Sequence, residues 1–278
     1  MGSSDVAPAH VPDWVVPLST VALGVGVLFW NATYILMTQR SLRTKSYPMP
    51  VLGLALNVSW EIVYALYVCE AFLETAGFTF WLILDIGLIY TTVRFAPYEW
   101  ERTSSWVGRH MAAILAVMTA VGCLGHFAFV SWWLSRPGIG HGDKSGKWYF
   151  GQDQYDTTEL AYWSAGVAQM IDSVGSLAML LVRGHSGGTS YAIWICRTIG
   201  TVSGMGVCNG ILWYYWPEAH GFFLNPLGMF LCGTALLCDL VYPFALWQVR
   251  KTEVALPDGR LVSQEQFNHM QMTGKKRL

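Results

Sequence analysis

The stretch MAAILAVMTAVGCLGHFAFVSWWL, which is Met111–Leu134, holds no Asp, Glu, Lys or Arg in 24 residues. A helix of about 20 mostly apolar residues is long enough to cross the hydrocarbon core of a bilayer. The stretch also lacks the strict alternation of apolar and polar residues that marks a strand of a membrane β-barrel. It is therefore predicted to be a transmembrane helix.

The same pattern recurs six more times on either side of this stretch. The seven predicted spans run roughly over Pro17–Met37, Val51–Cys69, Phe78–Val93, Met111–Leu134, Leu160–Val182, Tyr191–Trp216 and Phe222–Val249. Only 13% of the 278 residues are charged, about half the share in an ordinary soluble domain. The sequence thus predicts an all-α integral membrane protein, a seven-transmembrane-helix bundle.

The distribution of basic residues predicts the orientation of the bundle. Of the 17 Lys and Arg residues, 13 fall on one side, Arg136, Lys144 and Lys147 fall on the other, and Arg197 lies within a span. Cytoplasmic loops carry the excess of Lys and Arg in membrane proteins. We therefore expect a lumenal N-terminus and a cytoplasmic C-terminus.

Three parts of the chain follow from this assignment: a lumenal segment 1–16, a transmembrane domain 17–249 and a cytoplasmic tail 250–278. Residues 1–16 have no basic cluster and no convincing cleavage site, so the first span is predicted to be retained rather than removed as a signal peptide. The long lumenal loop 135–158 could fold over the bundle as a lid, although general loop behaviour favours a solvated connector.

Five ionisable side chains lie inside the predicted spans: Glu61, Asp85, Asp172, Arg197 and Asp239. A charge inside the hydrocarbon costs about 3 kcal/mol or more, so such residues are functional candidates by default. Four of the helices that carry them show a narrow polar stripe, which indicates one shared interior cavity.

These groups could simply pair with one another and hold the bundle together. However, four acids face one base, so at least three carboxyl groups lack a cation within the spans. Such a carboxyl tends to keep its proton, and a protonated acid in a dry pocket can act as a general acid. We therefore favour a catalytic role for Glu61 and Asp239. The roles of Asp85 and Asp172 stay open, because either could be the partner of Arg197.

Polar and aromatic neighbours of the two favoured acids complete the candidate site. Asn57 and Tyr64 lie one turn before and after Glu61 on the same helix face, and Trp60 is adjacent to it. Tyr242 follows Asp239 by three residues. Aromatic faces stabilise cations in a dry site, so an acid beside rings fits carbocation chemistry on a lipid-like substrate, although most rings are expected to pack in the core.

The absence of several motifs excludes other chemistries. No Lys lies in a span, which excludes a retinal Schiff base, and no DDxxD or DxDD cluster, GxSxG elbow or HExxH pair occurs. The six cysteines form no CxxC pair. We therefore predict no metal and no cofactor, and a net charge of −1 gives no reason to expect nucleic-acid binding.

Four motifs carry a resemblance to a known family. They are Asn57-Val-Ser-Trp-Glu61-Ile-Val-Tyr64, Asp85-Ile-Gly-Leu-Ile-Tyr90-Thr-Thr, the run from Arg183 through Ser190-Tyr191, Trp194, Arg197 and Gly200-Thr201, and Cys238-Asp239-Leu-Val-Tyr242-Pro243. In this order on a seven-span chain, they resemble the integral-membrane terpene cyclases of fungal meroterpenoid and indole-diterpene pathways (the paxilline and pyripyropene type). The chain is somewhat longer than is usual for that family.

This resemblance implies a function and a set of site residues. It implies proton-initiated cyclisation of a prenyl chain whose terminal alkene a separate epoxidase has oxidised, after an upstream prenyltransferase has attached it, in the endoplasmic reticulum. The two essential acids of the family fall on Glu61 and Asp239. The pocket and cation-shielding candidates are Asn57, Trp60, Tyr64, Asp85, Asp172, Arg197 and Tyr242.

Two alternatives remain at this stage. The same acids could catalyse isomerisation of a lipid-like substrate, or they could be ligand or proton sites of a seven-helix receptor or transporter. Against a receptor, the last span reads Asp239-Leu-Val-Tyr242-Pro243 and not NPxxY. Against a transporter, no internal repeat of the kind that supports alternating access is evident.

Overall fold

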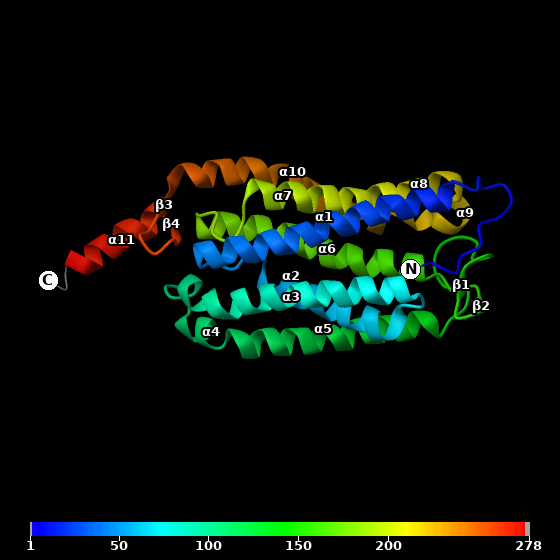
Figure 1. The fold of residues 1–278 in the computed structure, drawn as a ribbon, viewed down its shortest axis with the longest axis horizontal. Helices are drawn as coiled ribbons and strands as arrows, with labels where there is room; N and C mark the ends of the chain where they lie inside the picture. Colours follow the sequence, from blue (N-terminus) through cyan, green and yellow to red (C-terminus); the bar gives the residue numbers. More distant parts are fainter. Residues whose placement is uncertain (1, 276–278) are drawn as a thin grey trace.

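Long apolar helices run side by side along the longest axis of the molecule (Figure 1). The computed structural model describes residues 2–275; residue 1 and residues 276–278, which end the expected cytoplasmic tail, lie outside the described residues. Six helical segments are long and apolar enough to cross a membrane: α1 (Val15–Thr44), α2 (Val51–Val63) with the π-helix η1 (Tyr64–Val68), α3 (Phe72–Glu99), α5 (Met111–Leu134), α6 (Thr157–Arg183) and α10 (Pro226–Thr252). A mostly helical membrane protein is thus confirmed, with six such spans among the described residues where the sequence predicted seven.

The predicted span Tyr191–Trp216 consists of three consecutive elements. These are α7 (Tyr191–Thr201), the π-helix η2 (Val202–Val207) and α8 (Cys208–Tyr215), and α7 and α8 follow one line beside α1 (Figure 1). The segment widens where glycine recurs, at Gly204 and Gly206, because glycine is a poor α-helix former. A Cβ on Gly26 of α1 would lie 2.7 Å from the Gly204 Cα, so glycine lets these two segments approach closely.

Helix ends differ from the predicted spans where local capping decides them. The last span was expected to begin at Phe222, but residues Gly221–Leu224 form the 3₁₀ turn η3, and α10 begins at Pro226. The Asn225 side chain accepts a hydrogen bond from the Leu227 amide at 2.9 Å, and proline suits the first helical position. The short helix α9 (Pro217–His220) precedes this turn.

The outer surface of the bundle is apolar, whereas a few polar side chains lie between the helices in its interior. Side chains such as Leu28, Leu124 and Phe244 are 65%, 70% and 72% exposed, which in water would be a large unfavourable patch and in a bilayer faces lipid. Inside, α6 packs mainly against α10, α2 against α5, and α1 against α7.

One end of the bundle, here called the cap end, is closed by the loop 135–158 and the N-terminal segment (Figure 1). Within the loop, β1 (Trp148–Tyr149) pairs antiparallel with β2 (Gln152–Asp153). Lys144 and Lys147 are only 4% and 0% exposed. The loop is therefore packed over the helix ends. A solvated connector would instead extend into solvent.

The opposite end, here called the tail end, carries the short helix α4 (Ser105–Arg109) and the C-terminal segment. After α10, β3 (Glu253–Ala255) and β4 (Leu261–Ser263) form an antiparallel hairpin that leads into α11 (Gln264–Lys275). Figure 1 shows α11 projecting beyond the bundle. Between this segment and the helix ends lies an open cavity of about 480 Å³, lined among others by Tyr47 and Arg260, away from the intramembrane acids.

Candidate active site

The first group of intramembrane acids joins α1, α2 and α3. The Tyr34 hydroxyl donates to Glu61 Oε1 at 3.2 Å, and the Asn57 side-chain amide donates to the same oxygen at 3.0 Å. Asn57 also lies 3.3 Å from Asp85 Oδ2 and hydrogen-bonds the Tyr34 hydroxyl. Glu61 and Asp85 are fully buried. We call Glu61 and Asp85, bridged by Asn57, the acid pair.

One oxygen of each acid is unpartnered. Glu61 Oε2 and Asp85 Oδ1 are buried without a hydrogen-bond partner among the residues described. Buried polar atoms are almost always hydrogen-bonded, and Glu61 and Asp85 lie close enough to share a hydrogen bond once one of them is protonated. A proton therefore belongs at this pair. Arg197, the one base inside the predicted spans, pairs with Asp172 and Asp239 instead.

An aromatic cluster joins α2, η1 and α3 around Trp60, the residue before Glu61 in the sequence. The Trp60 ring lies 5.0 Å from that of Tyr64 and 4.8 Å from that of Phe78, with Trp81 at 6.3 Å. Trp60 Nε1 donates to Ser164 Oγ at 3.0 Å, and the Tyr64 hydroxyl lies 2.6 Å from the same oxygen. Because Ser164 holds the polar ends of both rings, their faces are fixed in orientation.

The second group of acids surrounds Arg197 and joins α6, α7 and α10. Arg197 Nη2 lies 2.5 Å from Asp239 Oδ1, and Nη1 lies 3.5 Å from Asp172 Oδ2. Ser173 donates to the second oxygen of Asp239 at 3.2 Å. The guanidinium also lies 5.2 Å from the Tyr242 ring centroid. We call Asp172, Arg197 and Asp239 the arginine cluster.

The structure decides which acid is the partner of Arg197. Asp172 was one of two expected partners and is confirmed; the other, Asp85, contacts Asn57 instead. Asp239, which the charge count left without a cation, contacts Arg197 more closely than Asp172 does. The reason is that α10 packs against both α6 and α7, a neighbour relation that one sequence does not reveal.

The two groups lie along one face of α2. Gly53, Asn57 and Glu61 are spaced by four residues and so share a face. A Cβ on Gly53 would lie 3.2 Å from Asp172 Oδ1, so Asp172 abuts this face two turns before Glu61. Eight residues of α-helix rise about 12 Å, which is the separation of the two groups along α2.

Sequence reasoning missed several contacts. Tyr34 was not predicted, because its helix carries no acid, although a tyrosine in an apolar span was a usable signal. Ser164 and Ser173 were also missed. The Tyr242 hydroxyl donates to Thr189 at 2.9 Å, so this predicted pocket residue presents its ring, and not its hydroxyl, to Arg197.

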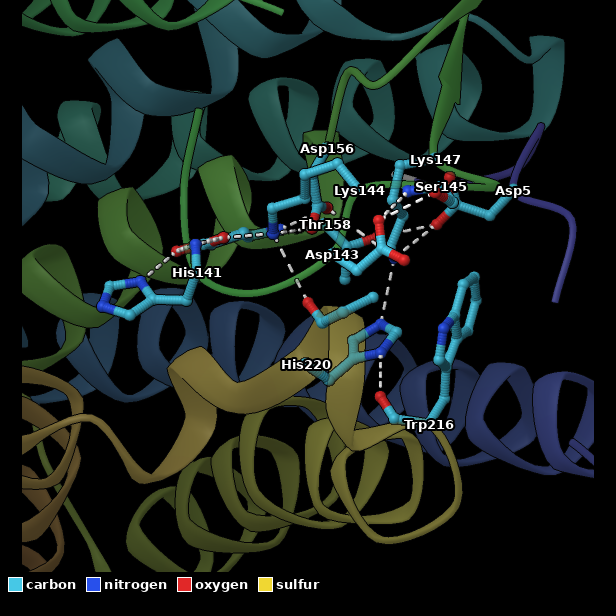
Figure 2. Close-up of polar contacts among 12 residues, drawn as sticks. Asp5, His141, Asp143, Lys144, Ser145, Lys147, Asp156, Thr158, Trp216 and His220 are labelled. Atoms are coloured by element: carbon cyan, nitrogen blue, oxygen red, sulfur yellow. Dashed lines mark hydrogen bonds and ion pairs between the residues drawn. The ribbon is translucent and has the colours of Figure 1, made fainter. Parts of the chain in front are cut away.

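A network of buried charges holds the cap end together (Figure 2). Lys147 Nζ lies 2.7 Å from Asp5, 3.7 Å from Asp156 and 3.0 Å from His220 Nε2. Lys144 Nζ lies 2.8 Å from Asp156 and 2.6 Å from Glu159. The network therefore links the N-terminal segment, the loop, the start of α6 and α9.

Charge states in this network follow from burial and from the lysines. Burial, and then the charge of Lys147, lower the pKa of His220 to about 3, so a neutral imidazole accepts the hydrogen bond from Lys147. Burial alone would raise the pKa of Asp156, but Lys147 and Lys144 together outweigh it and hold that pKa below its usual value. Asp156 also caps α6, since its side chain accepts from the Glu159 amide at 2.9 Å.

Comparison with known proteins places this arrangement in a family. Residues 4–252 match the Pyr4-like transmembrane terpene cyclases. The chain belongs to this family. It is thus a membrane terpene cyclase, as the four sequence motifs predicted, and the match ends at Thr252, so the β3–β4 hairpin and α11 lie outside it.

Individual terpene cyclases align with this one over most of their length. The chain is 36% identical to terpene cyclase ascF of Acremonium egyptiacum, over 93% of this chain and 91% of that protein. It is 32% identical to terpene cyclase penB of Penicillium crustosum and to terpene cyclase ptmB of Penicillium ochrochloron, in each case over 93% of this chain and 97% of the relative. No solved structure matches the chain.

Proposed function

We propose that this terpene cyclase protonates the terminal epoxide of a prenylated substrate, of the meroterpenoid or indole-diterpene type, and directs its cationic cyclisation. The observation that carries the proposal is the acid pair: two fully buried carboxyl groups bridged by one amide. Two like charges this close in a low dielectric are not both ionised, so the pair holds a proton that it can donate.

The hydrogen bonds of Glu61 support placing this proton on one atom. Oε1 accepts hydrogen bonds from both Tyr34 and Asn57, which makes it the carbonyl-like oxygen. The proton then belongs on Oε2, the oxygen without a partner among the described residues. Glu61 is accordingly the donor, and Tyr34 and Asn57 stabilise the carboxylate left behind when the proton is transferred.

The proposed reaction needs only this proton. The Oε2–H bond breaks, the epoxide oxygen takes the proton, and the C–O bond opens to a tertiary cation that the nearest alkene attacks to form a ring. The faces of Trp60 and Tyr64 stabilise the cation. Because strain in the epoxide drives the reaction, no metal or redox cofactor takes part, and we expect EDTA to leave turnover unchanged.

Asp239 has a supporting role in this proposal. It is the closer of the two carboxylates that hold Arg197, so it fixes the charge of the arginine cluster rather than contacting Glu61. Upstream, a prenyltransferase and an epoxidase must supply the substrate, because the cyclase itself forms no epoxide. We place the whole sequence of reactions at the endoplasmic reticulum membrane.

A direct assay tests the proposal. Microsomes carrying the protein are incubated with an epoxyfarnesyl phenol and, separately, with the same compound lacking the epoxide. We expect a cyclised product of unchanged mass from the epoxide alone. Equal conversion of both compounds would favour the acid-catalysed isomerase instead, and no conversion of any epoxyprenyl aromatic would contradict the proposal.

A further inference from the structure

We infer that Asp172 is the terminating base of the cyclisation, the group that removes the proton from the last cation. The inference rests on the proposed function, with Glu61 as the acid. A cyclase that begins with a protonated acid needs an ionised base where the cation ends. The environments of its titratable groups must therefore differ, and here Asp172 and Asp239 contact a cation, Arg197, which Glu61 and Asp85 lack among the described residues.

The arginine cluster keeps its carboxylates ionised. A guanidinium stays charged under all ordinary conditions, and Arg197 contacts Asp239 at 2.5 Å and Asp172 at 3.5 Å. The acid pair has no such cation among the described residues, as its unpartnered oxygens show. One group is thus arranged to release a proton and the other to accept one.

Asp172 rather than Asp239 faces the acid. Asp172 abuts Gly53, on the face of α2 that carries Asn57 and Glu61, whereas Asp239 lies on α10 between Arg197 and Ser173. The longer contact of Asp172 with Arg197 also leaves its oxygens less engaged. A carboxylate has about four lone-pair sites, and the contacts found for Asp172 are those with Arg197 and with Ser176 at 3.4 Å.

The separation of the acid from the base suits a short cascade. Two fused six-membered rings are about 5 Å long with ordinary C–C bonds of about 1.5 Å. A proton donor and a proton acceptor each lie about 3 Å from the atom they serve. Together these lengths approach the rise of roughly 12 Å along α2 between Gly53, which Asp172 abuts, and Glu61.

The proton balance closes over one turnover. Glu61 gives one proton to the epoxide oxygen. At the last cation an adjacent C–H bond breaks, its electron pair forms an alkene, and the proton passes to the Asp172 carboxylate. After product release, water exchanges the proton from Asp172 back to Glu61, so the net reaction is an isomerisation. Asp239 anchors Arg197 and thereby keeps Asp172 ionised.

The test measures product distribution, which a merely structural residue would not change. Asp172→Asn is incubated with an epoxyfarnesyl phenol, with folded protein quantified by fluorescence-detected size exclusion. We expect the epoxide still to be consumed, while the share of the normal product falls at least tenfold and products 18 Da heavier, or other alkene isomers, replace it. The normal product in its wild-type share, or an untouched epoxide with folded protein, would overturn the inference.

Two further variants make the result decisive. Asp172→Glu keeps the charge beside Arg197 and moves the base by one methylene, so the protein should fold and the ratio of alkene isomers should shift; an unchanged ratio would overturn the inference even if Asp172→Asn fails to fold. Glu61→Gln should stop epoxide consumption altogether. If folded Glu61→Gln still opens the epoxide, the proposed donor is wrong, a failure distinct from any seen with the Asp172 variants.

Discussion

Side chains of the same type have different neighbours in this protein. Glu61 and Asp85 share an amide and lack a cation among the described residues, whereas Asp172 and Asp239 share a guanidinium. Desolvation penalises an isolated charge far more than a paired one. In the proposed mechanism, the acid pair accordingly donates the proton and the arginine cluster stays ionised.

Replacing Glu61 by Gln tests the donor at the residue scale. The amide keeps the size of the side chain and removes no charge from a group that is already protonated, so the fold should persist. Turnover should fall by about 10²–10⁴-fold, the usual contribution of a general acid. Initial rates per folded molecule measure this. Asp239→Asn is the comparison. Unlike Glu61→Gln, it should also reduce the amount of folded protein, because it leaves Arg197 paired with Asp172 alone.

Removing the charge of Arg197 tests the arginine cluster. Arg197→Leu leaves Asp172 and Asp239 buried without their cation, and breaking a buried pair costs about 3–5 kcal/mol. We expect much less folded protein in detergent extracts. Arg102→Leu is the control, since that side chain is 41% exposed and its loss should be nearly neutral. Normal abundance with loss of turnover alone would instead make Arg197 a substrate-binding residue.

At the scale of elements, the π-helix η1 follows directly on the part of α2 that carries Glu61. The run Val51–Val68 changes from α to π at Tyr64, one turn after Glu61. Such local widening is frequent at functional sites. Apolar periodicity predicts the length of a segment but not a one-residue change of its winding, because that depends on the packing of its neighbours.

The loop 135–158 is the element whose stability should depend on pH. The pKa of His220 is about 3 in the folded cap against about 6.5 in an unfolded chain, so the unfolded state binds more protons between these values. Stability therefore falls as pH drops from about 6.5 toward 3. The lowered pKa of Asp156 acts in the same direction below its usual value, whereas the pKa of Asp5, raised by burial, opposes it.

Hydrogen exchange of the loop checks this dependence. We expect faster exchange of residues 135–158 at pH 4.5 than at pH 7, with little change in α5. His220→Gln, which does not titrate, should reduce the difference between the two pH values. Equal exchange at both pH values in the wild-type protein would contradict the role of His220.

At the scale of the whole molecule, glycosylation tests the orientation of the bundle in the membrane. The basic residues predict that the cap end is lumenal and the tail end cytoplasmic. A glycosylation acceptor engineered beside Phe150, which is 63% exposed, should be modified in the endoplasmic reticulum. One engineered beside Asp258 in the β3–β4 turn should not be. Modification of the acceptor beside Asp258 alone would contradict the predicted orientation.

The sequence by itself determined the class of the molecule, its family and the identity of the ionisable residues inside its predicted spans. Each of these properties is local: an apolar run of sufficient length must be a helix in lipid, and an acid within such a run is costly wherever its neighbours lie. The four family motifs are local in the same sense, since each occupies a single helix or one short run of chain. The contact between Arg197 and Asp172 was predicted by one further argument: Arg197 is the single base inside the predicted spans, so an acid of the spans was expected to pair with it.

Only the tertiary structure decided how these residues are grouped. It divided the five intramembrane ionisable residues between the acid pair and the arginine cluster, placed Tyr34 of α1 against Glu61, and paired Asp239 with Arg197. It also buried Lys144 and Lys147 within the loop. The reason is physical: a hydrogen bond or an ion pair between helices depends on which helices are neighbours and how they are rotated, and an apolar surface that faces lipid on several sides leaves that choice open until the helices pack.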